Sequence, residues 1–411
     1  MKQIEVDTLV IGAGLLGSSV AMHLAKLGVK DVRVVDLDLD GSQSSSELNA
    51  GGVRATWVQP INIQMSKLSI EFFSTVAMDV GYRPCGYLWL HTEKTYASGL
   101  KARERQIEFG WPVENWTPAQ LRDKVPFIDK TEDLAGALFA PRDGLLNPNL
   151  LKSYYRGQAK KNGAIFDDRI WVSKAKNSQG SWWIDCQEFP PMLSSEERSR
   201  LFSNTSGGSV PSSAVQYKAK NVVNCAGPWA SQIARVLGYE CPSQPVRRQV
   251  CIFDCRGVDL TPYGMIVDTS GVYFHPEATN GLAGFANPDE PPGFNFHYDG
   301  EEFFMEQVWS KLYERSTYFE RLRHITGWAG LYEVSPDETG IVGEVTLGEV
   351  GRAGGVFEAH SFSGHGVMHS YSAGLVLAEK IKTGKYQTLD VSILNGNRFA
   401  KGALIHETQI I

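Results

Sequence analysis

The chain has 411 residues, 42% of them hydrophobic, and a formal net charge of −6 from 46 acidic and 40 basic side chains. This length predicts two domains with enough apolar residues for their cores. Acidic and basic residues are mixed, without long runs of either sign, which argues against nucleic acid or a membrane surface as a partner. No apolar stretch is long and charge-free enough to predict a membrane span.

The six cysteines include no Cys-x-x-Cys pair. We therefore expect neither a zinc site nor a disulfide framework, and we assign no metal ligands. Reduced thiols favour a cytoplasmic location.

An apolar run at residues 6–11 leads directly into the pattern Gly-x-Gly-x-x-Gly, formed by Gly12, Gly14 and Gly17. A strand opening onto this pattern is typical of a dinucleotide-binding βαβ unit, in which the glycines allow a tight turn and close approach of a pyrophosphate. The phosphates then lie at a helix N-terminus, which favours anions. A signal peptide is the disfavoured alternative, because acidic rather than basic residues precede the run.

The segment that follows completes this unit. A helix is predicted over 18–27 and a strand over 32–35, which ends at Asp36, nineteen positions after Gly17. An acid at this place accepts hydrogen bonds from the hydroxyls of an adenosine ribose. Strand, helix, second strand and terminal acid in this order predict a nucleotide fold.

Small polar residues fill the next loop, 41–46. We expect its backbone to run close beside a cofactor, with Ser44 and Ser45 as contacts. A flexible linker is the alternative, but the apolar residues that follow give the segment something to bury.

Further along, the pattern alternates between helices and strands, and a Ser/Pro-rich stretch at 190–213 reads as an exposed excursion with one helical turn at 195–202. Predicted helices cover 61–77, 150–161, 302–315 and 369–382, and predicted strands cover 165–172, 181–186, 215–225, 246–253 and 272–274. The β-rich part after residue 245 indicates a second domain built on an antiparallel sheet.

Two glycine-rich turns follow strands. One contains Gly227, and the other, Gly364-His365-Gly366, opens the last long helix. The positive end of a second helix favours an anionic ring. Reduced flavin carries such a charge, whereas a nicotinamide has no need of it.

These motifs together resemble the FAD-dependent amine oxidoreductases of the D-amino-acid oxidase superfamily, over nearly the whole chain except 190–213. The resemblance implies an α/β protein, α+β overall, with a Rossmann-like FAD-binding domain and an interleaved substrate domain on an antiparallel sheet. We expect residues 1–84, 145–244 and 328–411 in the FAD-binding domain and residues 85–144 and 245–327 in the substrate domain.

The sarcosine oxidase and dehydrogenase branch is the most similar. Its tyrosine matches Tyr332, and its carboxylate-binding arginine matches Arg54. Its second carboxylate ligand, a lysine, is replaced here by Met368, which we expect to border the flavin.

The same resemblance bears on the flavin. The family's linking cysteine and histidine are replaced by Gly330 and Asn49, so we expect non-covalent FAD. The lysine that gives these oxidases their oxygen reactivity is absent from 281–284. We therefore favour a dehydrogenase, with a protein or quinone carrier as electron acceptor, over an oxidase that uses oxygen.

Four residues remain as candidates at the reacting centre. Tyr273 and Tyr332 are expected to form an aromatic wall for an amine, with ordinary core aromatics as the alternative. His275 and His365 could handle the proton of the amine, because imidazole titrates in the useful range. For His365, between two glycines, a flavin contact is favoured. For His275, a buried strand residue is the alternative.

We thus expect oxidation of a secondary amine or an N-substituted, sarcosine-like amino acid to an imine that hydrolyses. A flavin-containing assembly or interaction factor without turnover is the alternative. A nicotinamide-only dehydrogenase would leave the Gly-His-Gly turn unexplained.

Overall fold

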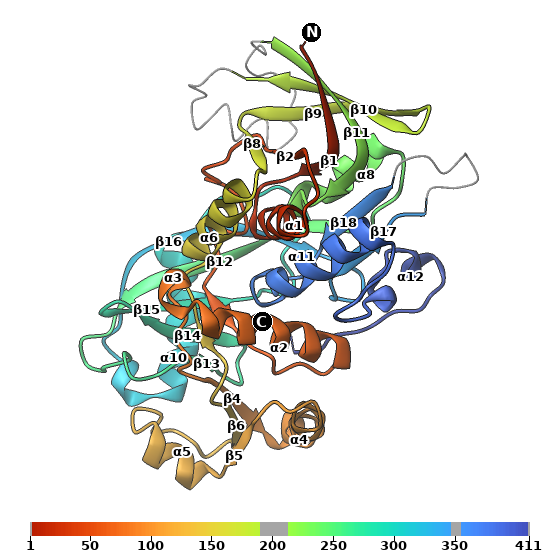
Figure 1. Ribbon diagram of the computed structural model, residues 1–411. Coiled ribbons are helices and arrows are strands. Elements are labelled where there is room, and N and C mark those ends of the chain that lie inside the picture. Colours follow the sequence, from red (N-terminus) through yellow and green to blue (C-terminus); the bar gives the residue numbers. More distant parts are fainter. Residues whose placement is uncertain (1, 190–212, 347–354, 410–411) are drawn as a thin grey trace.

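The computed structural model describes residues 2–189, 213–346 and 355–409, and the chain passes repeatedly between two eight-stranded sheets (Figure 1). Most of the predicted excursion at 190–213, with its helical turn, lies outside these residues. In the first sheet the strand order is β17-β18-β11-β1-β2-β8, and β10 and β9 extend it from β11. Its strands are β1 (Lys2–Ile11), β2 (Val32–Val35), β8 (Ile165–Asp167), β9 (Ile170–Ser178), β10 (Ser181–Glu188), β11 (Ser213–Asn224), β17 (Ile341–Glu344) and β18 (Val356–His360).

Strand β1 lies at the centre of this sheet. It pairs in parallel with β2 and with β11, so that Val10 stands opposite both Val34 and Val223. These three valines are fully buried. A run of apolar residues without alternation is what a parallel strand covered on both faces requires.

Four helices pack around the first sheet and the neighbouring loop: α1 (Leu15–Lys26), α2 (Pro60–Thr75), α6 (Pro148–Lys161) and α11 (Gly366–Thr383). The side chain of Asn147 accepts hydrogen bonds from two backbone amides of the first turn of α6, and Pro148 follows it, which explains where that helix begins. Helices α1 and α11 approach closely at Gly374, where a Cβ atom would lie 2.2 Å from Oγ of Ser19.

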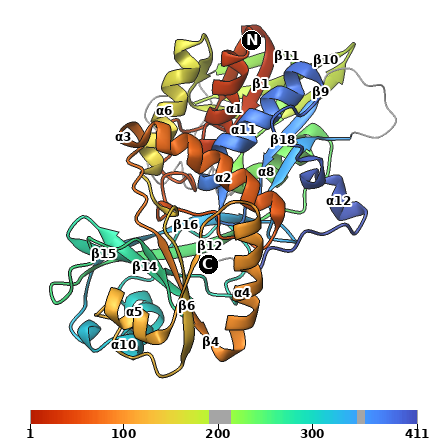
Figure 2. The same cartoon turned by 60° about the horizontal axis from the view of Figure 1, so that its bottom comes forward.

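The second sheet has the order β16-β12-β15-β14-β13-β4-β6-β5, and its pairs are antiparallel except β13 with β4. Figure 2 shows it below the first sheet, with α4 beside it. This confirms the expected α/β architecture with a Rossmann-like and an antiparallel part. The strands of the second sheet are β4 (Tyr87–Thr92), β5 (Glu114–Trp116), β6 (Leu134–Ala140), β12 (Gln244–Asp254), β13 (Met265–Val267), β14 (Val272–Glu277), β15 (Asn280–Phe285) and β16 (Arg323–Val334).

The two faces of this sheet serve different cores. Tyr273 and Leu282 belong to the core shared with α1 and α11, whereas Phe274 and Ala283 pack with the helical segment 301–315.

The remaining elements are α3 (Ala77–Val80), α4 (Glu93–Glu108), α5 (Pro118–Lys124), α8 (Ala230–Leu237), α9 (Glu301–Phe303), a π-helical stretch (Phe304–Trp309), α10 (Ser310–Arg315), α12 (Asn397–Ala400), three short 3-10 turns (Gly227–Trp229, Thr317–Phe319, Ser392–Leu394) and the small pair β3 (Gly52–Val53) and β7 (Gly144–Leu145).

One predicted strand is wrong. Residues 165–172 form two strands, β8 and β9, because Arg169 has a φ of +60° and the chain turns there. Strand β8 continues the parallel sheet next to β2, whereas β9 pairs antiparallel with β10. The predicted domain boundaries stay a prediction, although β16 pairs with β12 on both sides of Trp328.

Residues 403–409 return to the middle of the molecule, beside α2 (Figure 1). The carboxylate of Glu407 accepts hydrogen bonds from the backbone amides of Val58 and Gln59 and from the side chain of Asn62. It thereby satisfies amides at the start of α2, which has no side-chain cap of its own.

Candidate active site

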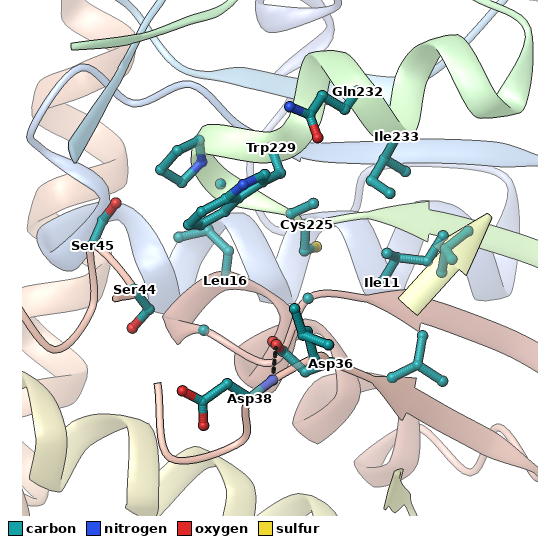
Figure 3. A pocket seen from close by; sticks show the side chains of 18 of the residues that line it. Ile11, Leu16, Asp36, Asp38, Ser44, Ser45, Cys225, Trp229, Gln232 and Ile233 are labelled. Carbon is teal, nitrogen blue, oxygen red and sulfur yellow. Dashed lines mark hydrogen bonds between the residues drawn. The ribbon is translucent and has the colours of Figure 1, made fainter. Parts of the chain in front are cut away.

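A cavity of about 460 Å³ lies where β1, β2 and β11 end. Figure 3 shows Asp36 and Asp38 on one side of it and Trp229 and Gln232 on another. Predicted cofactor contacts from four parts of the chain line it together: Gly12, Gly14, Asp36, Ser44, Ser45 and Gly227.

The glycines of the N-terminal turn are required by space. A Cβ on Gly12, which has a φ of +101°, would lie 2.3 Å from the carbonyl oxygen of Cys225. A Cβ on Gly17 would lie 1.9 Å from the carbonyl oxygen of Gly12. The N-cap residue of α1, Gly14, has no side chain to cap the helix, and Ser46 Oγ accepts from the amide of Leu15 at 3.0 Å. This cradle of close backbone and amides fits a pyrophosphate.

Asp36 reaches the cavity from the end of β2. Its two carboxylate oxygens accept hydrogen bonds from the amide of Ala13 at 2.5 Å and the amide of Asp38 at 3.0 Å. Desolvation raises the pKa of this carboxyl, and the two amides oppose the rise. Each oxygen keeps a further lone pair for a ribose hydroxyl.

The serine loop closes the adjacent wall. Ser45 Oγ donates to the carbonyl of Leu331 at 2.5 Å, and Ser44 Oγ accepts from the amide of Glu47 at 3.2 Å. Asn49 bonds to the carbonyls of Ser45 and Ser46. The loop is therefore an ordered turn that joins the two sheets.

A second, smaller cavity of about 50 Å³ lies between the second sheet, the loop 49–57 and the start of α11. The residues of the prediction that line it are Arg54, Tyr273, Tyr332, Gly364, His365 and Met368. The end of β16 lies between the two cavities, because Tyr332 lines the small one and its neighbour Glu333 lines the large one.

Arg54 is buried beside the small cavity. Its guanidinium lies 3.5 Å from the ring centroid of Trp57 and 4.9 Å from that of Trp89. It donates to the carbonyl of Thr56 at 2.9 Å and to the carbonyl of Gln409. Burial lowers its pKa. Among the described residues, no carboxylate lies within 4 Å of it.

Tyr273 and Tyr332 form the tyrosine pair of this cavity. Burial raises the pKa of Tyr332, and Arg248, Arg54 and a hydrogen bond from Tyr273 oppose the rise. Glycines make room for both rings. A Cβ on Gly284 would lie 2.3 Å from the hydroxyl of Tyr273, and one on Gly364 would lie 2.3 Å from the ring of Tyr332.

The start of α11 borders the same cavity. His365 precedes it, Gly366 is its first residue, and no side chain caps it. The two ring nitrogens of His365 have no hydrogen-bond partner within the described parts of the chain. Burial, His369 and Arg54 hold its pKa well below the ordinary value, so the ring is neutral. Uncapped amides and unpaired polar nitrogens fit the pyrimidine edge of a flavin.

The structure does not bring His275 into either cavity. One ring nitrogen lies 2.8 Å from the carbonyl oxygen of Pro276 and the other 2.8 Å from that of Ala50. Burial lowers its pKa. His275 thus connects β14 to the loop 49–57, and its catalytic role stays a prediction.

Residues 281–284, where the sequence has no lysine, belong to β15. Ala283 faces the core on the far side of the second sheet, so position 283 does not point toward the cavity. The positions of β15 on the same face as Tyr273 and His275 are Leu282 and Gly284. A one-residue shift in a strand moves a side chain to the other face.

Sequence reasoning missed three polar residues at the site. Glu333 has one carboxylate oxygen without a hydrogen-bond partner in the described residues, and burial raises its pKa. Arg248 lies on β12 with its guanidinium 5.2 Å from the ring centroid of Tyr332. Asp143 lies behind the Arg54 loop. Glu333 follows a tyrosine already singled out, which is the one signal that pointed to it.

The fold and the large cavity define a flavin- and dinucleotide-binding oxidoreductase. Residues 7–380 match the DAO family, described as FAD dependent oxidoreductase, and the chain belongs to this family. The resemblance stated from the motifs is confirmed, and the cofactor is FAD. No described helix is long and apolar enough for a membrane span, and the described residues include no cluster of metal-ligand type.

Similar proteins extend over most of the chain. "FAD-dependent oxidoreductase domain-containing protein 1" of Xenopus laevis is 29% identical, over 99% of this chain and 85% of its own length. Mitochondrial dimethylglycine dehydrogenase of Homo sapiens is 25% identical, over 98% of this chain and 46% of its own length. Monomeric sarcosine oxidase of a Bacillus species (strain NS-129) is 24% identical, over 96% of this chain and 97% of its own length.

Among solved structures, L-proline dehydrogenase from P. horikoshii has a TM-score of 0.82 at 23% identity, covering 98% of this chain and all of that one. Glycine oxidase from Geobacillus kaustophilus has a TM-score of 0.76 at 20% identity, covering 96% of this chain and 99% of that one. These likenesses show a shared fold.

Proposed function

We propose that this protein oxidises a secondary amine or an N-substituted, sarcosine-like amino acid to an imine, which water hydrolyses. The observation that carries the proposal is Arg54, a buried guanidinium that lines the small cavity together with the tyrosine pair. The relatives named for dimethylglycine and sarcosine support an N-methylated substrate.

Each residue has a separate part in this proposal. Arg54 binds the substrate carboxylate and so fixes which hydrogen of the substrate faces the flavin. Tyr273 and Tyr332 form the wall for the amine, with a cation–π attraction of about 0.5–2 kcal/mol for the protonated form. Met368 and the neutral His365 would border the ring of the flavin. Bound FAD supplies the two-electron acceptor for the C–H bond beside nitrogen.

We propose that FAD is held without a covalent bond. Position 330 leaves no room for a linking side chain, since a Cβ on Gly330 would lie 2.9 Å from Cβ of Leu48. Asn49 is an amide and not a nucleophile, and its side chain shapes the loop turn.

Electron transfer to a protein or quinone carrier is favoured over transfer to oxygen, because Leu282 and Gly284 place no ammonium group on the cavity side of β15. Arg248, 5.2 Å from the ring centroid of Tyr332, is a guanidinium and not the lysine ammonium on which the oxygen reactivity of the similar oxidases depends. The cytoplasm is the proposed compartment, supported by six free cysteines. Cell fractionation tests it against the mitochondrion, which the name of one relative indicates.

The test is anaerobic bleaching of the flavin spectrum by sarcosine, N,N-dimethylglycine, proline and D-amino acids. We expect reduction by an N-substituted amino acid and a large loss of that reduction rate in Arg54→Lys, because an ammonium cannot reproduce a bidentate contact. Arg103→Lys, on α4, is the matched control. Tight FAD binding without reduction by any amine would reject the proposal and favour an assembly or interaction factor.

A further inference from the structure

A buried carboxyl group lies directly behind the Arg54 loop. Asp143, in the turn between β6 and β7, has no exposed surface. One of its oxygens accepts from the amide of Ala55 and from the indole nitrogen of Trp111, each at 2.8 Å. The other accepts from Oγ1 of Thr56 at 3.1 Å. Asp143 therefore fixes the backbone that carries Arg54.

The two buried charges are linked through Thr56. Its carbonyl accepts from the guanidinium of Arg54 at 2.9 Å, while its hydroxyl donates to Asp143. No carboxylate in the described residues is paired directly with Arg54, and a buried charge without a counter-charge is unfavourable. The carboxylate of Asp143 is thus one of the charges that compensate Arg54 when no ligand is present, beside that of Glu407.

The remaining groups around this pair set the charge balance. Tyr82 and Tyr87 face Asp143, and burial raises the pKa of both, so they stay neutral. Arg142 is half-exposed and is screened by water. Glu407 contributes a second carboxylate on the Arg54 side, where it is bound to the start of α2.

We propose that Asp143 is a positioning residue for Arg54 that takes up one proton when an anionic ligand binds at that guanidinium. The inference rests on the proposed function in one respect, that Arg54 binds a carboxylate. The carboxylate of a ligand adds a further negative charge beside Arg54. Of the two carboxylates already there, Asp143 has a hydroxyl among its donors, which can turn to accept from a new O–H, whereas Glu407 is held by N–H donors.

The proton comes from the solvent and forms an O–H bond at Asp143, and no bond in the ligand changes. The oxygen near Thr56 is the acceptor, because that hydroxyl can turn and accept the new hydrogen bond, whereas the other oxygen keeps its two N–H donors. Burial raises the pKa of Asp143 to about 7, and Arg54 opposes the rise. A second anion at Arg54 weakens that opposition and raises the pKa further.

The experiment uses the FAD-loaded protein and pyrrole-2-carboxylate, an aromatic carboxylate without an oxidisable C–N bond. Binding is followed by the flavin absorbance, and proton uptake by calorimetry at pH 8 in two buffers of different ionisation enthalpy. We expect close to one proton taken up and a Kd that rises up to tenfold per pH unit above pH 7.

Asp143→Asn keeps the acceptor for the two N–H donors and cannot titrate. We expect it to bind FAD normally and to bind the ligand without proton uptake and with a Kd independent of pH from 6.5 to 8.5. Asp123→Asn, an exposed carboxyl on α5, is the control and should behave as the wild type.

The outcomes separate the two proposals. Ligand binding without proton uptake in the wild type, or uptake that persists in Asp143→Asn, overturns the inference and leaves Arg54 as the carboxylate site. Absence of binding, or equal binding of the uncharged pyrrole-2-carboxamide, overturns both.

Discussion

Replacement of Asp36 tests the cofactor site most directly. A hydrogen bond to a charged group contributes about 1.5–3 kcal/mol, so Asp36→Ala should raise the Kd for FAD by about 10- to 150-fold. The variant also leaves two amides, those of Ala13 and Asp38, without their acceptor. Water in the cavity can reach these amides, so we expect the added loss of apoprotein stability to stay near the lower end of about 1–3 kcal/mol each.

The assay is titration of apoprotein with FAD, followed by quenching of flavin fluorescence, together with thermal unfolding of the apoprotein. Asp36→Asn should fall between the wild type and Asp36→Ala, because one oxygen acceptor remains. Asp167→Asn is the matched control. Asp167 stands beside Val35 on the neighbouring strand β8 and is paired with Arg33 at 2.7 Å, and it does not line the cavity. A Kd for Asp36→Ala within threefold of the wild type, or an equal loss in Asp167→Asn, would refute the assignment.

Four further predictions concern other parts of the site. Gly17→Ala should abolish FAD binding, because its Cβ would lie 1.9 Å from the carbonyl oxygen of Gly12. Gly157→Ala is the control and should bind FAD normally, because a Cβ there meets no atom within 4 Å. Acid precipitation should release all flavin into the supernatant, and flavin left on the polypeptide would disprove non-covalent binding. Stopped-flow reoxidation should be slower with oxygen than with a dye and faster in Leu282→Lys, and equal wild-type rates would reject the dehydrogenase assignment. The pKa of Asp143 is raised on folding from 3.8 to about 7, so the folded state binds this proton more tightly than the unfolded state. The free energy of unfolding of the wild type should therefore fall, relative to that of Asp143→Asn, as the pH rises through that range. Urea unfolding of both proteins at pH 5 and pH 8 measures this difference.

The parts that were predictable from the sequence are those whose requirement is local. Gly12 and Gly17 are needed by the turn and helix in which they stand, and Asp36 ends the strand of the same unit. Arg54 and Tyr332 were placed by resemblance, since no local pattern brings a loop residue and a residue 278 positions later to one cavity.

The parts that were not predictable depend on partners distant in the sequence or on exact register. Asp143 acts on Ala55, 88 positions earlier, so neither residue shows its role alone. The orientation of Ala283 depends on how β15 pairs with β14, and an offset of one residue assigns it to the wrong face. The break at Arg169 follows from a backbone conformation that its residue type does not announce.

The central position of β1 has a consequence for the order of folding. Its partner β11 is completed only at Asn224, and α11, which packs on α1, ends at Thr383. As the chain leaves the ribosome, the side of α1 that packs on α11 therefore stays uncovered until the residues of α11 have been made. Such long-range pairing slows folding and exposes apolar surface to aggregation. The lining of the FAD cavity extends from Ile11 to Ala359, so this cavity is complete only after those residues have been made.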